Sequence, residues 1–151
     1  MRHRCRAVTG VLAALSLVVV LAGATAPQNT DVSVSVTDMR SAKGQVLACL
    51  TTRPDAFPDC EKDPQARKLT VPAAIDLHLD FGAVPQGRYA VSLIHDENGN
   101  GKLDTRLMIP REGYGFSRDA PVRMGPPKFA QAAFDVAGDP VRLAIRMRYL
   151  L

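Results

Sequence analysis

Apolar and polar residues alternate with a period of two along much of the chain, which is the pattern of β-strands with one buried face. The segment 32–36 is the clearest case, with valines at every second position between serines. The segment 89–94 (YAVSLI) is apolar on both faces, which predicts a central strand. Applied to the whole chain, the pattern predicts strands over residues 32–36, 45–51, 69–71, 75–81, 89–94 and 141–149.

Helical periodicity is nearly absent, and only the segment 127–133 (PKFAQAA) predicts a short helical turn. Several short strands with turn residues between them predict an all-β fold, a single antiparallel β-sandwich. A long loop rich in glycine and proline, residues 96–130, interrupts the strand rhythm. Long irregular loops in compact domains are often functional, so this loop is the first place to look for a site.

Two of the predicted strands carry rows of opposite charge. Asp76, His78 and Asp80 share one strand face, and Arg142, Arg146 and Arg148 share a face of the last strand. If these strands are neighbours in a sheet, we expect cross-strand ion pairs between the two rows.

Residues 1–26 have the layout of a secretory signal peptide. A positive start with three arginines precedes an apolar run over residues 8–21, and small residues follow at Ala24 and Ala26. The run is shorter than the about 20 residues of a membrane span. We expect cleavage after Ala26 and one domain over residues 27–151. Ala24 stands where a lipoprotein signal would have its lipidated cysteine, so no membrane anchor is expected, and the mature protein would be soluble and either periplasmic or secreted.

Most of the net positive charge of the chain lies in residues 1–26. The whole chain has 19 Lys and Arg against 15 Asp and Glu, a formal net charge of +4. Three of the arginines lie in residues 1–26, which contain no acidic residue, so the remainder is close to neutral. A near-neutral exported protein is a poor candidate for a nucleic-acid partner.

Two of the three cysteines, Cys49 and Cys60, remain in residues 27–151. In an oxidising compartment they most readily form one disulfide. The segment between them contains Pro54 and Pro58 and cannot be regular secondary structure, so a covalent closure makes sense there. A redox pair is the alternative, but the spacing is not Cys-x-x-Cys.

The sharpest motif is HDENGNGKLD, residues 95–104. Its oxygen-bearing residues follow the spacing of a calcium loop, with a glycine where the loop must turn and a carbonyl contributed at position 7. The expected metal residues are Asp96, Asn98, Asn100, Lys102 and Asp104.

The motif also departs from a calcium loop. Position 12 is Leu107 instead of a bidentate glutamate, so a cation would need another ligand, from Glu97, Glu112 or a backbone carbonyl. The alternative is a plain hairpin turn, because Asn-Gly dipeptides favour such turns and could join residues 89–94 to residues 103–109. Both interpretations can hold together if an ion fixes the turn.

The loop motif and several other segments together resemble the bacterial DUF2141 family of exported proteins of unknown function. The matching segments include Gly-Tyr-Gly-Phe-Ser at 113–117, Gly-Pro-Pro-x-Phe at 125–129, RSAKG at 40–44 and PQGRYAV at 85–91. The resemblance covers about residues 31–149. It implies a β-sandwich of transthyretin-like type and supplies no catalytic residues.

Basic and aromatic residues share the long loop and suggest a second kind of site. Aromatic faces and guanidinium groups together could hold a cell-envelope ligand such as a sugar, a peptide or an anionic glycan. The candidate ligand-binding residues are Arg111, Tyr114, Phe116, Arg118 and Arg123. The alternative is a loop that packs on itself, with its aromatic rings against the sheets.

We assign no catalytic residue from the sequence. Glu97 and Glu112 could form a carboxylate pair for hydrolysis of envelope glycans, but that chemistry requires a fixed separation that a sequence does not give. The leading hypothesis is a non-enzymatic exported β-sandwich that binds calcium and an envelope ligand or protein. A glycan hydrolase and a purely structural module are the alternatives.

Overall fold

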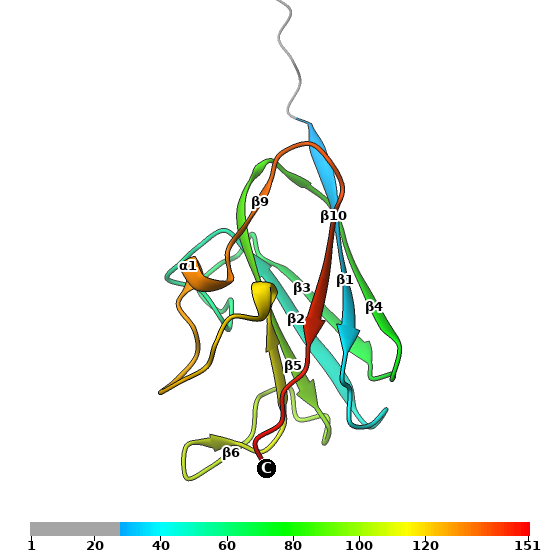
Figure 1. Cartoon of the computed structure of the whole chain (residues 1–151), viewed down its shortest axis with the longest axis vertical. Helices are drawn as coiled ribbons and strands as arrows, with labels where there is room; N and C mark the ends of the chain where they lie inside the picture. The colour runs from blue at the N-terminus through cyan, green and yellow to red at the C-terminus, as the bar shows by residue number, and fades with distance from the viewer. Residues whose placement is uncertain (1–27) are drawn as a thin grey trace, which may run out of the picture.

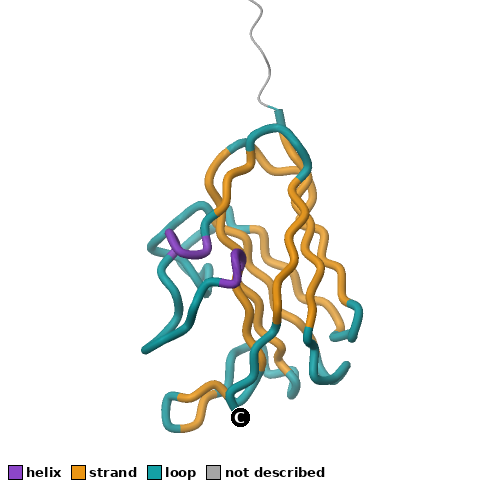
Figure 2. The backbone as a smooth tube through the Cα atoms, viewed as in Figure 1, coloured by secondary structure: helices purple, strands orange, loops and turns teal. Residues whose placement is uncertain are grey.

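The computed structural model describes residues 28–151, and this part of the chain is almost entirely strands and loops (Figures 1 and 2). The predicted signal peptide lies outside the described residues. Two sheets, of three and of five strands, face each other across one core, and a small hairpin stands apart from both. Within the described residues no helix is long and apolar enough to cross a membrane. The elements are β1 (Asn29–Thr37), β2 (Gln45–Thr51), β3 (Arg67–Pro72), β4 (Leu77–Pro85), β5 (Gly87–Asp96), β6 (Thr105–Arg106), β7 (Ile109–Pro110), β8 (Gly113–Phe116), η1 (Ser117–Asp119), α1 (Phe129–Ala132), β9 (Phe134–Val136) and β10 (Val141–Arg146).

The first sheet has the strand order β10-β1-β4. The alternation in β1 does what the sequence predicts, because Val32, Val34 and Val36 are all buried while the residues between them are not. β4 runs antiparallel to β1, but β10 runs parallel to it. The expectation of a purely antiparallel fold is therefore wrong for this pair. Its reason is visible in Figure 1: the chain crosses from β9 to β10 at the end of the molecule where β1 begins, so both strands run the same way.

The second sheet has the order β3-β2-β5-β8, and β9 pairs with the first residues of β5. β5 is its central strand, as the doubly apolar pattern of residues 89–94 predicts, and seven of its ten residues are buried. The main core lies between the two sheets and draws on β1, β4 and β10 from one sheet and β2 and β5 from the other. A smaller apolar cluster forms where α1 and the segment after β8 pack against β5.

One predicted pairing is wrong, and the condition for a second is not met. The partner of β5 after the turn is β8, and residues 103–109 contribute instead to a separate hairpin of β6 and β7. The rows of opposite charge do not meet either, because β1 lies between β4 and β10. Arg146 and Arg148 pair with Asp119 instead.

The two sheets are also joined through the backbone at one edge. Tyr114 of β8 and Arg148, just beyond β10, exchange two hydrogen bonds, with N···O distances of 3.0 and 2.8 Å. β8 can approach so closely because it carries glycines. A Cβ on Gly113 would lie 2.4 Å from the Tyr149 ring, and one on Gly115 would lie 2.9 Å from the Ile145 side chain. The glycines of the 113–117 motif therefore serve packing.

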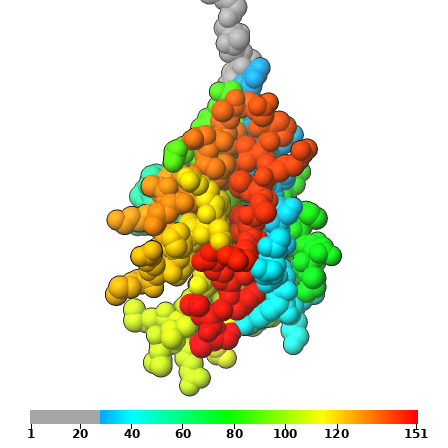
Figure 3. Space-filling view, in the orientation of Figure 1, coloured from blue at the N-terminus to red at the C-terminus, as the bar shows by residue number. Residues whose placement is uncertain are grey.

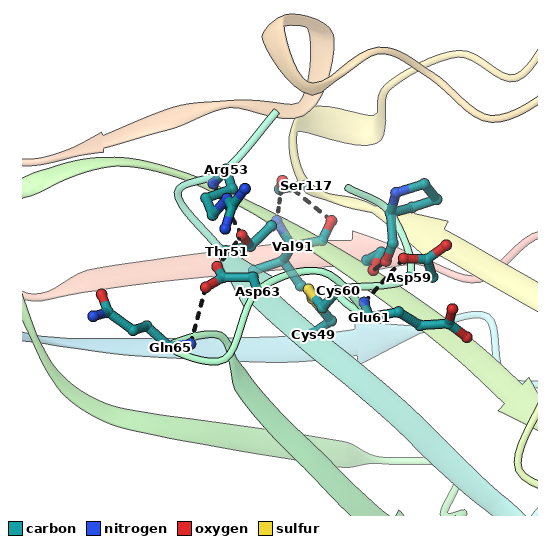
Figure 4. Close-up of a disulfide and its surroundings, with 12 residues drawn as sticks. Cys49, Thr51, Arg53, Asp59, Cys60, Glu61, Asp63, Gln65, Val91 and Ser117 are labelled. Atoms are coloured by element: carbon teal, nitrogen blue, oxygen red, sulfur yellow. Dashed lines mark hydrogen bonds between the residues drawn. A yellow bond between two sulfur atoms is a disulfide. The ribbon is translucent and has the colours of Figure 1, made fainter. Parts of the chain in front are cut away.

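Cys49 and Cys60 form the predicted disulfide, with Cα atoms 6.3 Å apart (Figure 4). The bond closes a loop without regular structure after β2. Buried Asp63 orders the following turn, since its carboxylate accepts hydrogen bonds from the Thr51 hydroxyl at 2.6 Å and from the Gln65 backbone at 2.9 Å. The hydrogen bond from Thr51 lowers the pKa of Asp63 more than burial raises it.

Candidate functional site

The calcium-type motif begins at the last residue of β5, where the Asp96 carboxylate organises the whole turn. Asp96 is fully buried. One of its oxygens accepts backbone N–H groups from Gly99 at 2.8 Å and Asn100 at 3.1 Å; the other accepts from Gly101 at 2.7 Å and from the Gln45 amide at 2.7 Å. Burial raises the pKa of Asp96, but these hydrogen bonds together outweigh it and leave the pKa below its ordinary value. Asp96 is therefore an ionised, fully bonded cap at the base of the turn.

Above this cap, two amides converge on one carboxylate. The side-chain nitrogens of Asn98 and Asn100 lie 2.6 and 3.0 Å from the two oxygens of Asp104. The hydrogen bond from Asn100, followed by that from Asn98, lowers the pKa of Asp104. The amide oxygens of the same two residues accept backbone N–H groups of Asn100 and Lys102. Four of the five predicted metal residues thus lie in one hydrogen-bonded group. The fifth, Lys102, has an exposed side chain and takes part through its backbone.

Glu112 joins the two ends of this loop from below. It is 4% exposed, and its two oxygens accept the backbone N–H of Glu97 at 3.0 Å and of Asp104 at 2.9 Å. Buried backbone N–H groups must be satisfied, so Glu112 fixes the distance between the start and the end of the loop. Within residues 28–151 no group of three or more His, Cys, Asp or Glu side chains is arranged to hold a metal, so a cation in this loop would depend on amide and carbonyl oxygens as well as carboxylates.

Arg40 ties three distant segments to the same region. Its guanidinium pairs with Glu97 and donates to the backbone carbonyls of Leu151 at 2.6 Å and Arg111 at 3.0 Å. It also lies 4.4 Å from the centre of the Tyr149 ring. The hydrogen bond from Arg40 lowers the pKa of Glu97 against the opposing effect of burial. Sequence reasoning did not single out Arg40 as a site residue, and the only signal for it was its place in the RSAKG segment.

His95 completes the network beneath Arg40. It is fully buried, with Nε2 2.8 Å from the Lys43 carbonyl and Nδ1 2.8 Å from the Tyr149 hydroxyl. Because a carbonyl can only accept, Nε2 carries a proton and donates. Gly44, which follows Lys43 in the chain, lies against the end of β5. A Cβ at this position would lie 2.1 Å from the Asp96 carbonyl oxygen, so there is no space for a side chain.

The five predicted ligand-binding residues do not gather on one surface. Tyr114 and Phe116 are 5% and 9% exposed and pack in the smaller apolar cluster, where Phe116 also contacts Phe57. The exposed Arg118 directs its guanidinium to the carbonyl of Ala133 at 3.1 Å. Arg111 and Arg123 are exposed. Because the two rings are buried, they are not at the surface, where the envelope-ligand hypothesis needs them.

Glu97 and Glu112 come close together, but both are committed to other roles. Glu97 binds Arg40 and the Ser41 hydroxyl, the latter at 2.9 Å, and both oxygens of Glu112 accept backbone N–H groups. A general acid or base needs a free oxygen within reach of substrate. This arrangement gives no support to the glycan hydrolase.

Two facing sheets with a shared core and an acid-and-amide loop at one end define an all-β protein with a candidate cation-binding loop. The chain belongs to the family described as "Uncharacterized protein conserved in bacteria (DUF2141)", whose model matches residues 34–144. No curated protein and no solved structure matches the chain. The match spans both sheets and the whole of the loop 96–104, as the resemblance in sequence implies.

Proposed function

We propose that the protein is an exported, non-enzymatic β-protein that binds a calcium ion through the loop 96–104. The observation that carries the proposal is the convergence of Asn98 and Asn100 on the Asp104 carboxylate, at 2.6 and 3.0 Å, directly above the turn capped by Asp96. An amide carries its oxygen and its nitrogen at nearly equivalent positions, so a half-turn of either side chain would direct an oxygen to the same place. Carboxylate, amide and carbonyl oxygens are the ligands that calcium prefers.

The folded state of the loop favours such a role because no large rearrangement is needed. Three backbone N–H groups already hold the turn around Asp96, and Glu112 already fixes the two ends. Pre-organisation lowers the entropic cost of binding. The absence of a glutamate at position 12 leaves part of the coordination shell to water, so we expect an affinity weaker than that of an EF-hand sensor.

Export and the finer fold class are part of the same proposal. The Cys49–Cys60 bond supports an oxidising compartment, as does the layout of residues 1–26. Two facing sheets with one common core support a transthyretin-like sandwich. Arg111 and Arg123 are the residues left for contact with an envelope ligand. The burial of Tyr114 and Phe116 favours a structural role for the rest of the loop.

The test is thermal unfolding of metal-stripped protein with added calcium or magnesium. A ligand that binds only the native state adds about 2.7 kcal/mol at a hundred times its Kd, which for a domain of this size raises Tm by about 10 °C. Calcium should produce this rise and magnesium a much smaller one, because magnesium demands near-ideal octahedral geometry at shorter distances and gives up its waters reluctantly.

Asp104→Asn is the matched variant, since it keeps the shape of the side chain and removes one charge from the loop. Asp139→Asn is the control, because Asp139 is exposed in a different loop. Loss of the calcium shift in the first variant and its retention in the second support the proposal. An unshifted Tm in about 10–100 mM calcium, which is about a hundred times a weak extracellular Kd of about 10⁻⁴–10⁻³ M, overturns it.

A further inference from the structure

The β6–β7 hairpin places apolar side chains where the rest of the fold places polar ones. Leu107 and Met108 form its two-residue tip and are 87% and 93% exposed; Ile109 beside them is 42% exposed. Figure 3 shows this part of the chain, in yellow-green, projecting from the lower left of the molecule. A second loop, residues 121–128, projects on the same side and carries Met124, which is fully exposed.

The backbone of the tip makes this exposure more notable. Leu107 and Met108 both have positive φ, 51° and 66°. Two-residue hairpin turns with positive φ at both positions are normally Asn-Gly or a similar pair, because other residues are strained there. The chain therefore keeps two large apolar residues at positions that favour small polar ones. Neither packing nor turn geometry explains that choice, and strained positions that persist tend to be functional.

Basic residues flank the tip in the sequence. The segment 102–111 (KLDTRLMIPR) contains Lys102, Arg106 and Arg111 against the single acid Asp104, and Arg123 lies in the second projecting loop. All four cations are exposed, and none forms an ion pair within residues 28–151. Of the nearby acids, Glu97 is paired with Arg40 and Glu112 is buried, so neither offsets this charge at the surface.

We propose that this tip docks the protein on an anionic lipid surface, with Leu107 and Met108 inserted among the headgroups and the surrounding arginines against the lipid phosphates. An apolar insertion with a basic collar is the chemistry of peripheral attachment to anionic bilayers. A protein partner fits less well, because a specific interface needs about 800 Å² on each side and a two-residue convex tip offers far less. The proposal does not depend on calcium and is tested without it.

The experiment is co-sedimentation of the exported protein with vesicles in EDTA, after mass spectrometry has established its N-terminus. One set of vesicles is phosphatidylcholine alone, and the other contains about one-third phosphatidylglycerol to supply the negative surface potential. The exported protein should sediment with the anionic vesicles, less with the neutral ones, and less at high salt.

The decisive variant is Leu107→Asn with Met108→Gly, which installs the preferred residues of this turn and so preserves the fold while removing the apolar tip. We expect it to lose vesicle binding about ten-fold or more. Arg106→Gln with Arg111→Gln should remove the preference for anionic vesicles by a similar factor. Ile75→Asn is the control, since Ile75 is 54% exposed but lies before β4, and it should bind as the parent does.

Three outcomes overturn the proposal. The first is failure of the parent protein to sediment with anionic vesicles. The second is undiminished binding by the Asn-Gly variant. The third is self-association of the parent in sedimentation velocity that the Asn-Gly variant abolishes, because the tip would then be a contact between copies of this chain.

Discussion

Two turns lie within a dozen residues of each other and solve the same backbone problem in opposite ways. The turn at 98–101 reverses the chain with glycines at positive φ, 73° at Gly99 and 81° at Gly101, and Asp96 satisfies its N–H groups. The turn at 107–108 reverses the chain with Leu107 and Met108 at similar angles and exposes both side chains. The first turn is optimised for its own stability. The second turn is less stable than it could be, because strained residues occupy it, and it exposes an apolar surface. We attribute this difference to a function of the hairpin.

The largest expected effect tests how tightly the first turn is held to the rest of the fold. Gly44→Ala should destabilise the protein by more than about 3 kcal/mol, because the new Cβ combines a positive φ of 70° with a contact of 2.1 Å to the Asp96 backbone. Gly99→Ala is the matched control: its φ of 73° is nearly the same, but nothing lies within 4 Å. It should cost only about 1 kcal/mol. Equal losses in urea unfolding would show that conformation, not close approach, sets the cost.

Removing the cap should be the next largest effect. Asp96→Ala leaves three backbone N–H groups and the Gln45 amide without their acceptor, which should cost about 2–3 kcal/mol in metal-free buffer. Asp104→Ala removes only contacts with two exposed amides and should cost much less than Asp96→Ala. Chemical denaturation of the two variants side by side measures the difference. A larger loss at Asp104 would mean that Asp96 is not the organiser of the turn.

Acid should weaken the first turn and leave the second unaffected. The pKa values of Asp96 and Glu97 are both lowered in the folded protein, so their contribution is complete above the ordinary carboxyl pKa of about 4 and is lost as pH falls through the depressed values. The unfolding free energy should therefore fall as the pH drops below about 4. Glu97→Gln should flatten part of this dependence, because it removes one of the two carboxylates whose pKa is lowered. An unchanged slope in Glu97→Gln would contradict the assignment.

The smallest effect has the opposite sign. Leu107→Asn with Met108→Gly relieves two strained positions in the second turn and should raise the unfolding free energy by about 1 kcal/mol, with a Tm higher by a few degrees. Differential scanning calorimetry of the variant and the parent gives the sign directly. A lower Tm would mean that the apolar tip has a stabilising contact and that the contrast between the two turns is overstated.

The strands that carry a strong period of two could be predicted from the sequence. β1, β2 and the centre of β5 follow the predicted segments, and α1 lies inside the one predicted helical turn. β8 escaped prediction because Gly113 and Gly115 give it no apolar period, although both are required by the close packing of Tyr149 and Ile145. The pairing of strands could not be predicted either. Alternation identifies which face of a strand is buried, but not which strand forms hydrogen bonds with its edge.

The candidate site divides in the same way. The loop residues from Asp96 to Asp104 are local, and their spacing pointed to them directly. Arg40 and Tyr149 reach the site from the two far ends of the described chain, and only the fold brings them to Glu97 and His95. The strained φ angles of Leu107 and Met108 depend on the short β6–β7 ladder, which has no recognisable signature in sequence.

The parallel pairing of β1 with β10 also determines when the molecule can finish folding. Among the described residues, the central strand of the first sheet is the first strand, and one of its two partners is the last. A chain that has been synthesised only as far as residue 140 lacks the strand that pairs with one edge of β1. Contacts between residues that are distant in sequence slow folding and leave intermediates that are prone to aggregation. The first sheet is thus completed only when the last strand of the described residues pairs with the first.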